Sequence, residues 1–112
     1  DIIYNVGDLA KLNENGEFNK VIDVVVSEEI TNIGDTQFFT YDYIKSITLH
    51  NKVTSIGNKV FVGCDAFESI YFNGTLQEWQ QVEIVGGLSD CTDENVVVYV
   101  LDSNNNYIAI NA

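Results

Sequence analysis

The stretch ITNIGDTQFF, residues 30–39, recurs as VTSIGNKVF at residues 53–61. The offset between the two copies is 23 residues (53 − 30), and it places Phe61 in the position of Phe38. Repetition at a fixed period of roughly 20 to 50 residues is typical of proteins built from stacked structural units. The sequence therefore predicts a repeat architecture with a 23-residue unit.

Apolar side chains alternate with other residues just upstream of each copy, and once more beyond the second copy. This period of two is typical of strands with one buried face. Because the pattern returns at the same spacing, we expect three parallel strands that lie side by side and bury their inward side chains against their neighbours. The residues expected to face inward are Val24, Val26, Ile47, Leu49, Ile70 and Phe72.

A short segment follows the Ile-Gly pair of each copy. Asp35 and Asn58 occupy equivalent positions in it, and both side chains can accept hydrogen bonds from free N–H groups at the start of a helix. We expect a single helical turn in each copy, with Phe38 and Phe61 buried. Gly63 is expected to close the second turn in a left-handed conformation.

The N-terminal end of the chain departs from the repeat and is expected to act as a cap. The sequence there predicts one amphipathic helix, which an Asn-Gly pair at residues 15–16 would end. Its apolar side would consist of Val6, Leu9, Ala10 and Leu12. We expect one domain over residues 1–112, divided into an N-terminal cap (1–21), repeats (22–74) and a C-terminal helix and hairpin cap (75–112).

The C-terminal cap begins with Thr75 and Glu78, which form the sequence pattern of a capping box. We expect a short helix that covers the end of the stack with one apolar face, formed by Leu76, Trp79 and Val82. The 23-residue period gives Trp79 the position of Ile56 (56 + 23), so we expect its ring in the core.

The last part of the chain predicts a β-hairpin. The segment 95–101 is rich in β-branched residues, and the polar run 102–106 has the composition of a turn. A second strand is expected at 107–110. Asp102, Asn104 and Asn106 alternate like the start of a calcium loop, but the later Gly and Glu of such a loop are missing, which favours the turn.

The repeat also resembles a known family. The segment SITLHNKVTSIGNKVFVGCDAFESIYFNGTLQEWQQV, residues 46–82, is similar to the BspA-like class of leucine-rich repeats. This resemblance implies an α/β repeat fold, a short leucine-rich-repeat solenoid with parallel strands on one face and short helical turns on the other. It also implies a bacterial cell-surface or secreted protein, since some relatives are adhesins that attach to host matrix proteins or to other microbes.

Composition restricts the possible partners. The chain has 112 residues, 17 acidic residues against five lysines, and a formal net charge of −12, so a nucleic-acid backbone would be repelled. No apolar run approaches the roughly 20 residues that span a bilayer, so we expect no membrane insertion by this fragment. The opening at Asp1, without Met or signal-like residues, suggests a piece of a longer protein.

The sequence contains few cysteine and histidine residues that could take part in catalysis or metal binding. The two cysteines, Cys64 and Cys91, lack CxxC spacing and fit either one disulfide or two buried thiols. His50 is the single histidine, and the common nucleophile, phosphate-loop and zinc motifs are absent from the sequence. We therefore expect no enzyme, no metal site and no cofactor.

The best candidate site is the outward face of the parallel strands. Alternation places six residues there: Val25, Ser27, Thr48, His50, Tyr71 and Asn73. Extended repeat surfaces of this kind suit recognition, and we expect a protein or glycan ligand. The alternative is that these positions are solvated strand residues without a ligand.

Two other functions remain open. The chain could be the last repeats of a longer array, serving as a spacer or cap for a site elsewhere. It could also be an acidic protein that mimics nucleic acid and inhibits a basic partner, which the charge alone suggests.

Overall fold

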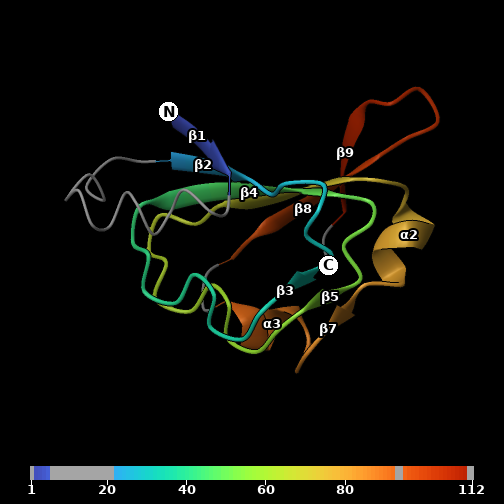
Figure 1. The fold of residues 1–112 in the computed structure, drawn as a ribbon. Helices are drawn as coiled ribbons and strands as arrows, with labels where there is room; N and C mark the ends of the chain where they lie inside the picture. The colour runs from blue at the N-terminus through green and yellow to red at the C-terminus, as the bar shows by residue number, and fades with distance from the viewer. Residues whose placement is uncertain (1, 6–21, 93–94, 111–112) are drawn as a thin grey trace.

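The computed structural model describes residues 2–5, 22–92 and 95–110 and contains two sheets (Figure 1). The larger sheet has six strands in the order β1-β2-β4-β6-β8-β9, of which all but β9 are mutually parallel. Its strands are β1 (Ile2–Asn5), β2 (Ile22–Val25), β4 (Ile44–His50), β6 (Ser69–Asn73), β8 (Val97–Leu101) and β9 (Tyr107–Ile110). Parallel strands at repeat spacing confirm the predicted α/β repeat.

The smaller sheet lies across the core from the larger one and also runs parallel (Figure 1). Its strands are β3 (Asn32–Ile33), β5 (Ser55–Ile56) and β7 (Glu83–Ile84). Each repeat thus contributes one long strand to the large sheet and one two-residue strand to the small sheet. A pair of strands this short buries little alone, so stacking on the next repeat supplies the core of each unit.

The strand register confirms the 23-residue period for two repeats and shows where it changes. Ile47 pairs with Ile70, and Ile33 pairs with Ile56, both at an offset of 23. Ile56, however, pairs with Ile84 at an offset of 28 (84 − 56). The five extra residues (28 − 23) equal the length of α2 (Leu76–Gln80), the helix inserted between β6 and β7.

The expected equivalence of Trp79 and Ile56 is therefore wrong, because the pairing partner of Ile56 is Ile84. The prediction that Trp79 is buried is confirmed, and its ring lies 5.4 Å from that of Phe72. Leu76 was expected on the same covering face but is exposed. The capping box is confirmed: Thr75 Oγ1 accepts from Glu78 N, and Thr75 N donates to Glu78 Oε1.

The side of each repeat opposite the large sheet consists of consecutive turns, and the predicted helical turns after Asp35 and Asn58 are wrong. Thr36, Thr40 and Lys59 have positive φ, which breaks a right-handed helix. Gly63 is left-handed as predicted, with φ of 81°.

Hydrogen bonds between repeats replace the helix in these turns. Asp35 caps the next repeat, since its Oδ1 accepts from Asn58 N at 2.8 Å. Phe38 N donates to Val60 O at 3.2 Å, and Phe61 N donates to the carbonyl of Cys91 at 2.8 Å. The turns therefore form a ladder that runs along the stack, and α3 (Leu88–Cys91) occupies the third position of that ladder.

The core lies between the two sheets and consists of apolar columns at repeat spacing. All six side chains expected to face inward are buried. The Phe38 and Phe61 rings stack at 5.6 Å, and Phe61 stacks on Phe67 at 4.2 Å. Cys64 and Cys91 are both buried and form no disulfide, which settles the alternatives in favour of two buried thiols.

The sequence predicted the structure of the C-terminal end of the chain better than that of the N-terminal end. The C-terminal hairpin is confirmed, with β8 and β9 antiparallel, and β8 also continues the parallel ladder next to β6. The predicted N-terminal helix falls within residues 6–21, outside the described residues. The strand β1, parallel to β2, was not predicted.

Candidate functional site

The outer face of the large sheet presents side chains in rows that cross the strands. One row runs through Val25, Thr48, Tyr71 and Tyr99, which are consecutive register partners. A second row, two residues earlier on each strand, runs through Asp23, Ser46, Ser69 and Val97. The parallel register thus brings together residues that are 23 or 28 positions apart in the chain.

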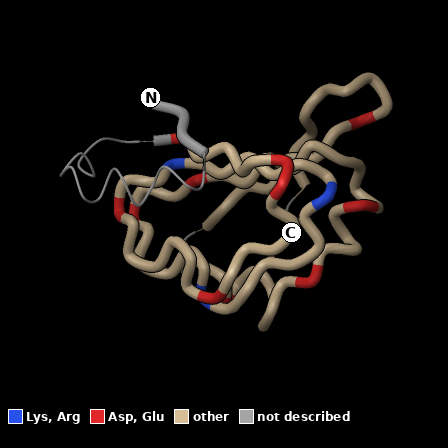
Figure 2. Tube along the Cα trace, viewed as in Figure 1, with Lys and Arg blue, Asp and Glu red and all other residues tan. Residues whose placement is uncertain are grey.

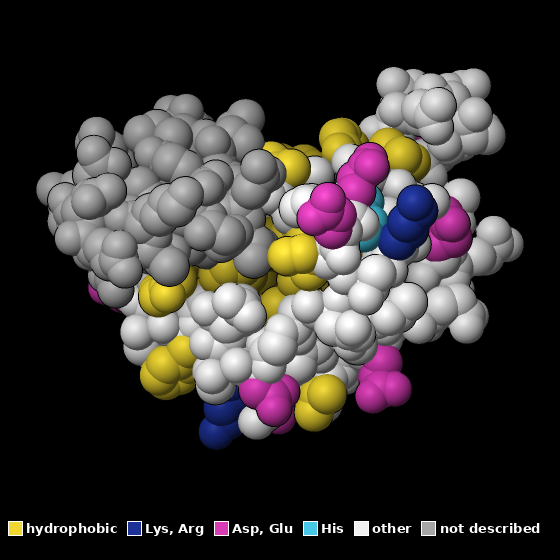
Figure 3. All heavy atoms as spheres, in the orientation of Figure 1, with side chains coloured by type: hydrophobic (Ala, Val, Ile, Leu, Met, Phe, Trp, Pro, Cys, Tyr) yellow, Lys and Arg dark blue, Asp and Glu magenta, His cyan; other side chains and the backbone are white. Residues whose placement is uncertain are grey.

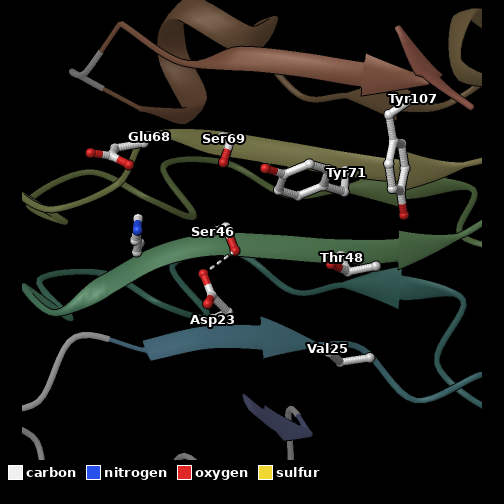
Figure 4. A pocket seen from close by; sticks show the side chains of 9 residues that line it. Asp23, Val25, Ser46, Thr48, Glu68, Ser69, Tyr71 and Tyr107 are labelled. Atoms are coloured by element: carbon white, nitrogen blue, oxygen red, sulfur yellow. Dashed lines mark hydrogen bonds between the residues drawn. The ribbon is translucent and has the colours of Figure 1, made fainter. Parts of the chain in front are cut away.

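A hollow of about 520 Å³ lies over these two rows (Figure 4). That volume falls within the roughly 300–1,000 Å³ that ligand sites usually have. The side chains that line it are Asp23, Val25, Lys45, Ser46, Thr48, Glu68, Ser69, Tyr71 and Tyr107. Three of the six sequence-predicted positions, Val25, Thr48 and Tyr71, therefore meet in one cavity.

The floor of the hollow is made of small polar side chains. Ser46 and Ser69 are buried at adjacent register positions, and their short side chains leave the space that longer ones would fill. Ser46 Oγ donates to Asp23 Oδ1 at 2.5 Å, which fixes the carboxylate at the edge of the floor (Figure 4). The floor thus offers hydroxyl donors and carboxylate acceptors at the same place.

A cluster of three tyrosines lies at the C-terminal end of the strands, and two of them, Tyr71 and Tyr107, form the wall of the hollow. Tyr71 stacks on Tyr99 with ring centroids 4.8 Å apart and planes 9° from parallel. Tyr107, from β9, lies edge-on to Tyr71 at 5.1 Å, and its hydroxyl donates to Asn73 Oδ1. Tyr99 covers one face of Tyr71 and does not line the hollow, so the ring borders the hollow through its other face.

The pKa of Tyr107 is raised above its ordinary value. Partial burial beside the ring cluster is the main cause, and the neighbouring Tyr71 hydroxyl adds to it, while the hydrogen bond to Asn73 acts in the opposite direction. The phenol is protonated at neutral pH and can donate the hydrogen bond to Asn73.

The other three predicted positions lie beyond the hollow and make internal contacts. His50 Nδ1 accepts from Lys52 N at 3.1 Å, so Nε2 carries the proton and donates to Ser27 O at 3.0 Å and Ile30 O at 2.8 Å. The imidazole, drawn in cyan in Figure 3, is largely surrounded by its neighbours. The His50 ring thus connects two neighbouring repeats. Asn73 holds Tyr107 in position through the hydrogen bond that it accepts from the Tyr107 hydroxyl.

The surroundings of His50 and Cys91 both disfavour a catalytic role. Both ring nitrogens of His50 are occupied by backbone groups. Burial raises the pKa of the Cys91 thiol to about 11, against smaller opposing effects of backbone hydrogen bonds, so a reactive thiolate is scarce at neutral pH. Within the described ranges no group of three or more His, Cys, Asp or Glu side chains is placed to hold a metal ion.

Sequence reasoning missed most of the floor. Asp23, Ser46 and Ser69 are 23 residues apart, as are Lys45 and Glu68, so a search for polar columns at the repeat period would have found them. Tyr107 lies after the period has ended and carries no such signal. It reaches the hollow only because β9 folds back beside β8.

Charged side chains are dispersed around this fold. In Figure 2 the acidic residues lie at several separate places along the loops and turns. The hollow itself has two carboxylates, Asp23 and Glu68, and one ammonium group, Lys45. No helix among the described residues is both long enough and apolar enough to cross a membrane.

Comparison with known proteins gives a family and no individual relative. Neither curated proteins nor solved structures give a match to this chain. The family model of the BspA-type leucine-rich repeat region matches residues 16–83, which is 68 of 112 residues (83 − 16 + 1). The matched segment contains β2 to β6, α2 and the 23-residue period, and the chain therefore belongs to the BspA-type leucine-rich repeat family.

Proposed function

We propose that this chain is a noncatalytic binding module of a cell-surface or secreted protein, and that it binds a protein or glycan ligand in the manner of an adhesin. Leucine-rich repeats generally mediate interactions rather than catalysis, and this family is associated with surface and secreted proteins. The observation that carries the proposal is the tyrosine-walled hollow on the outer face of the large sheet.

The architecture belongs to the same proposal. The described repeats form a short solenoid within one domain, in which residues 22–74 are the repeats and residues 75–112 form the C-terminal cap. Residues 1–21 are assigned to the N-terminal cap. The antiparallel strand β9 supports this assignment, because it ends the parallel ladder.

The structural features weigh differently on the two competing functions. A spacer or cap has no use for a partly open hollow that is walled by two tyrosine rings. A mimic of nucleic acid would need carboxylates in a row at phosphate-like spacing. The dispersed acidic residues of Figure 2 suit general solvation better than such mimicry.

Adhesion of beads coated with the purified chain tests this function. The surfaces would carry extracellular matrix proteins or immobilised neutral glycans. Thr48→Arg places a long charged side chain in the middle of the hollow, whereas Gln77→Arg adds the same charge at an exposed position on α2. We expect Thr48→Arg to abolish adhesion and Gln77→Arg to retain it, with circular dichroism showing both folded. Equal adhesion of the two variants would refute a role for the sheet face.

A further inference from the structure

We infer that the hollow is a saccharide subsite that takes one pyranose ring of a neutral glycan, an inference that rests on the proposed function and names its ligand class. Three features carry it: an aromatic face at one side of the hollow, a hydroxyl-rich floor, and the negative charge of the lining and of the whole chain.

The aromatic feature is the side of the Tyr71 ring that faces away from Tyr99. A ring face carries the negative part of the aromatic quadrupole, and the C–H groups on one side of a pyranose ring are weakly positive. The two rings therefore stack favourably. Stacking on Tyr99 and the edge contact with Tyr107 hold Tyr71 in place before any ligand arrives, which lowers the entropy cost of binding.

The polar floor completes the recognition. A sugar ring presents adjacent hydroxyls, each a donor and an acceptor. The Asp23 carboxylate can accept several hydrogen bonds, of which the bond from Ser46 uses one, and Ser69 and Thr48 can both donate and accept. In Figure 4 Ser69 lies next to the Tyr71 ring on β6, and Ser46 and Asp23 follow on the adjacent strands β4 and β2. All four side chains line the same hollow, so one ligand can reach both kinds of contact.

The position of the hollow favours a saccharide over a peptide. A peptide strand binds to a sheet by pairing with an open edge. The hollow lies over β2, β4 and β6, where the backbone groups already pair with each other. Its floor is hydroxylic and lacks the deep apolar pocket that anchors a protein side chain.

The charge of the chain selects neutral glycans over anionic ones. The net charge is −12, and Asp23 and Glu68 line the hollow against the single cation Lys45. Sialylated or sulfated sugars would meet like charge, which costs free energy on binding.

Chemical-shift perturbation on the 15N-labelled chain tests the inference. The probes are the neutral disaccharides lactose, cellobiose and N,N′-diacetylchitobiose, with 3′-sialyllactose as the anionic comparison and an unstructured neutral peptide as the protein-like one. We expect millimolar binding of at least one neutral disaccharide, with shifts centred on the amides of Ser46, Thr48, Ser69 and Tyr71. Shifts caused only by sialyllactose or only by the peptide would overturn the inference.

Two variants and one control separate the contacts. Tyr71→Leu removes the aromatic face while keeping an apolar side chain, and we expect about three- to tenfold weaker binding. Asp23→Asn keeps the shape and removes the charge, and should also weaken binding. Phe39→Ala, at an exposed position in a turn, should leave the affinity unchanged. Unchanged affinity in both hollow variants would contradict the saccharide subsite.

The outcome is distinguishable from a failure of the proposed function. If no neutral disaccharide binds while Thr48→Arg still abolishes adhesion to matrix proteins, the sheet face binds a ligand of another class. If Thr48→Arg leaves adhesion intact as well, the binding function of this face fails too.

Discussion

At the scale of single residues, the chain illustrates how an outward strand position can serve the fold rather than a ligand. Alternation correctly places His50 on the outer face of β4, yet its ring nitrogens bond to three backbone groups of the neighbouring turns. Alternation gives only the side of the sheet on which a side chain starts, while a long polar side chain at a strand end can fold back onto the turn.

Replacing His50 should therefore cost stability. His50→Ala leaves Lys52 N and the carbonyls of Ser27 and Ile30 without their side-chain partner, and we expect a loss of about 1–3 kcal/mol in the free energy of unfolding. Chemical denaturation measures it. Thr48→Ala is the control, since no side-chain hydrogen bond of Thr48 is seen in the described part of the chain. Equal losses in the two variants would contradict a structural role for the imidazole.

The buried thiol of Cys91 should make stability fall at alkaline pH. Its pKa is raised from 9.0 to about 11, so the folded state holds the proton more tightly than the unfolded state. The contribution is complete below pH 9 and is lost as pH rises towards about 11, by roughly 2–3 kcal/mol in total. We expect the loss of unfolding free energy between pH 8 and pH 11 to be smaller in Cys91→Ala than in the native chain. An identical pH dependence would count against burial as the cause.

At the scale of elements, equivalent positions of the repeat differ in what lies over them, and the two Ile-Gly glycines show this most clearly. A Cβ at Gly57 would lie 2.6 Å from Asp35 N and 2.8 Å from Gly34 C, because the preceding turn packs directly on it. A Cβ at Gly34 would meet nothing closer than Gln37 Oε1 at 3.5 Å. Close packing of the preceding turn thus requires glycine at Gly57, but nothing comparable requires it at Gly34.

Alanine at these two positions gives a matched test of repeat stacking. Gly57→Ala must push the turns apart, and we expect a loss of about 1–3 kcal/mol in the free energy of unfolding. Gly34→Ala should remain within about 0.5 kcal/mol of the native chain. Thermal melts followed by circular dichroism compare them, and a larger loss at Gly34 would contradict the stacking geometry.

The elements also show which parts of the fold were predictable from sequence. Strands β4 and β6 and the hairpin could be predicted because the alternation of apolar residues and the repeat period are visible in the amino-acid sequence itself. The turns were mistaken for helices because Asp35 can cap either its own segment or the next repeat, and only the three-dimensional stacking decides between them. The residue that pairs with Ile56 in the small sheet could not be predicted. The five-residue helix α2 lengthens the repeat but does not change the pattern of alternating apolar residues.

The candidate site was predictable to the extent that it follows the repeat. Val25, Thr48 and Tyr71 follow from alternation, and the serine floor follows from the period once the polar columns are sought. The second tyrosine of the wall, Tyr107, does not follow from either, because its contact with Tyr71 depends on where the hairpin folds. Non-repetitive contacts of this kind complete the site and carry no periodic signal.

At the scale of the whole molecule, two strands close the C-terminal end of the stack. Strand β8 covers the core, and β9 pairs with the outer edge of β8. Val98 and Val100 of β8 are fully buried, next to the ends of the columns formed by Ile70 and Phe72. The residues of β9 are mostly exposed, so this strand mainly pairs with the edge of β8. The two strands of the hairpin should therefore contribute very unequally to stability.

Two truncations measure that difference. Ending the chain after Leu101 removes β9, and we expect a cooperative thermal transition at a lower temperature, together with self-association through the exposed edge of β8. Ending it at Thr92 also removes β8. Burial of Val98 and Val100 is worth about 3–6 kcal/mol together, before the loss of cover on Ile70 and Phe72 is added. This approaches the roughly 5–15 kcal/mol that stabilises a typical domain, so we expect no cooperative transition in the shorter chain. Light scattering and calorimetry on both chains distinguish the cases, and a cooperative melt without β8 would mean that the earlier repeats enclose their own core.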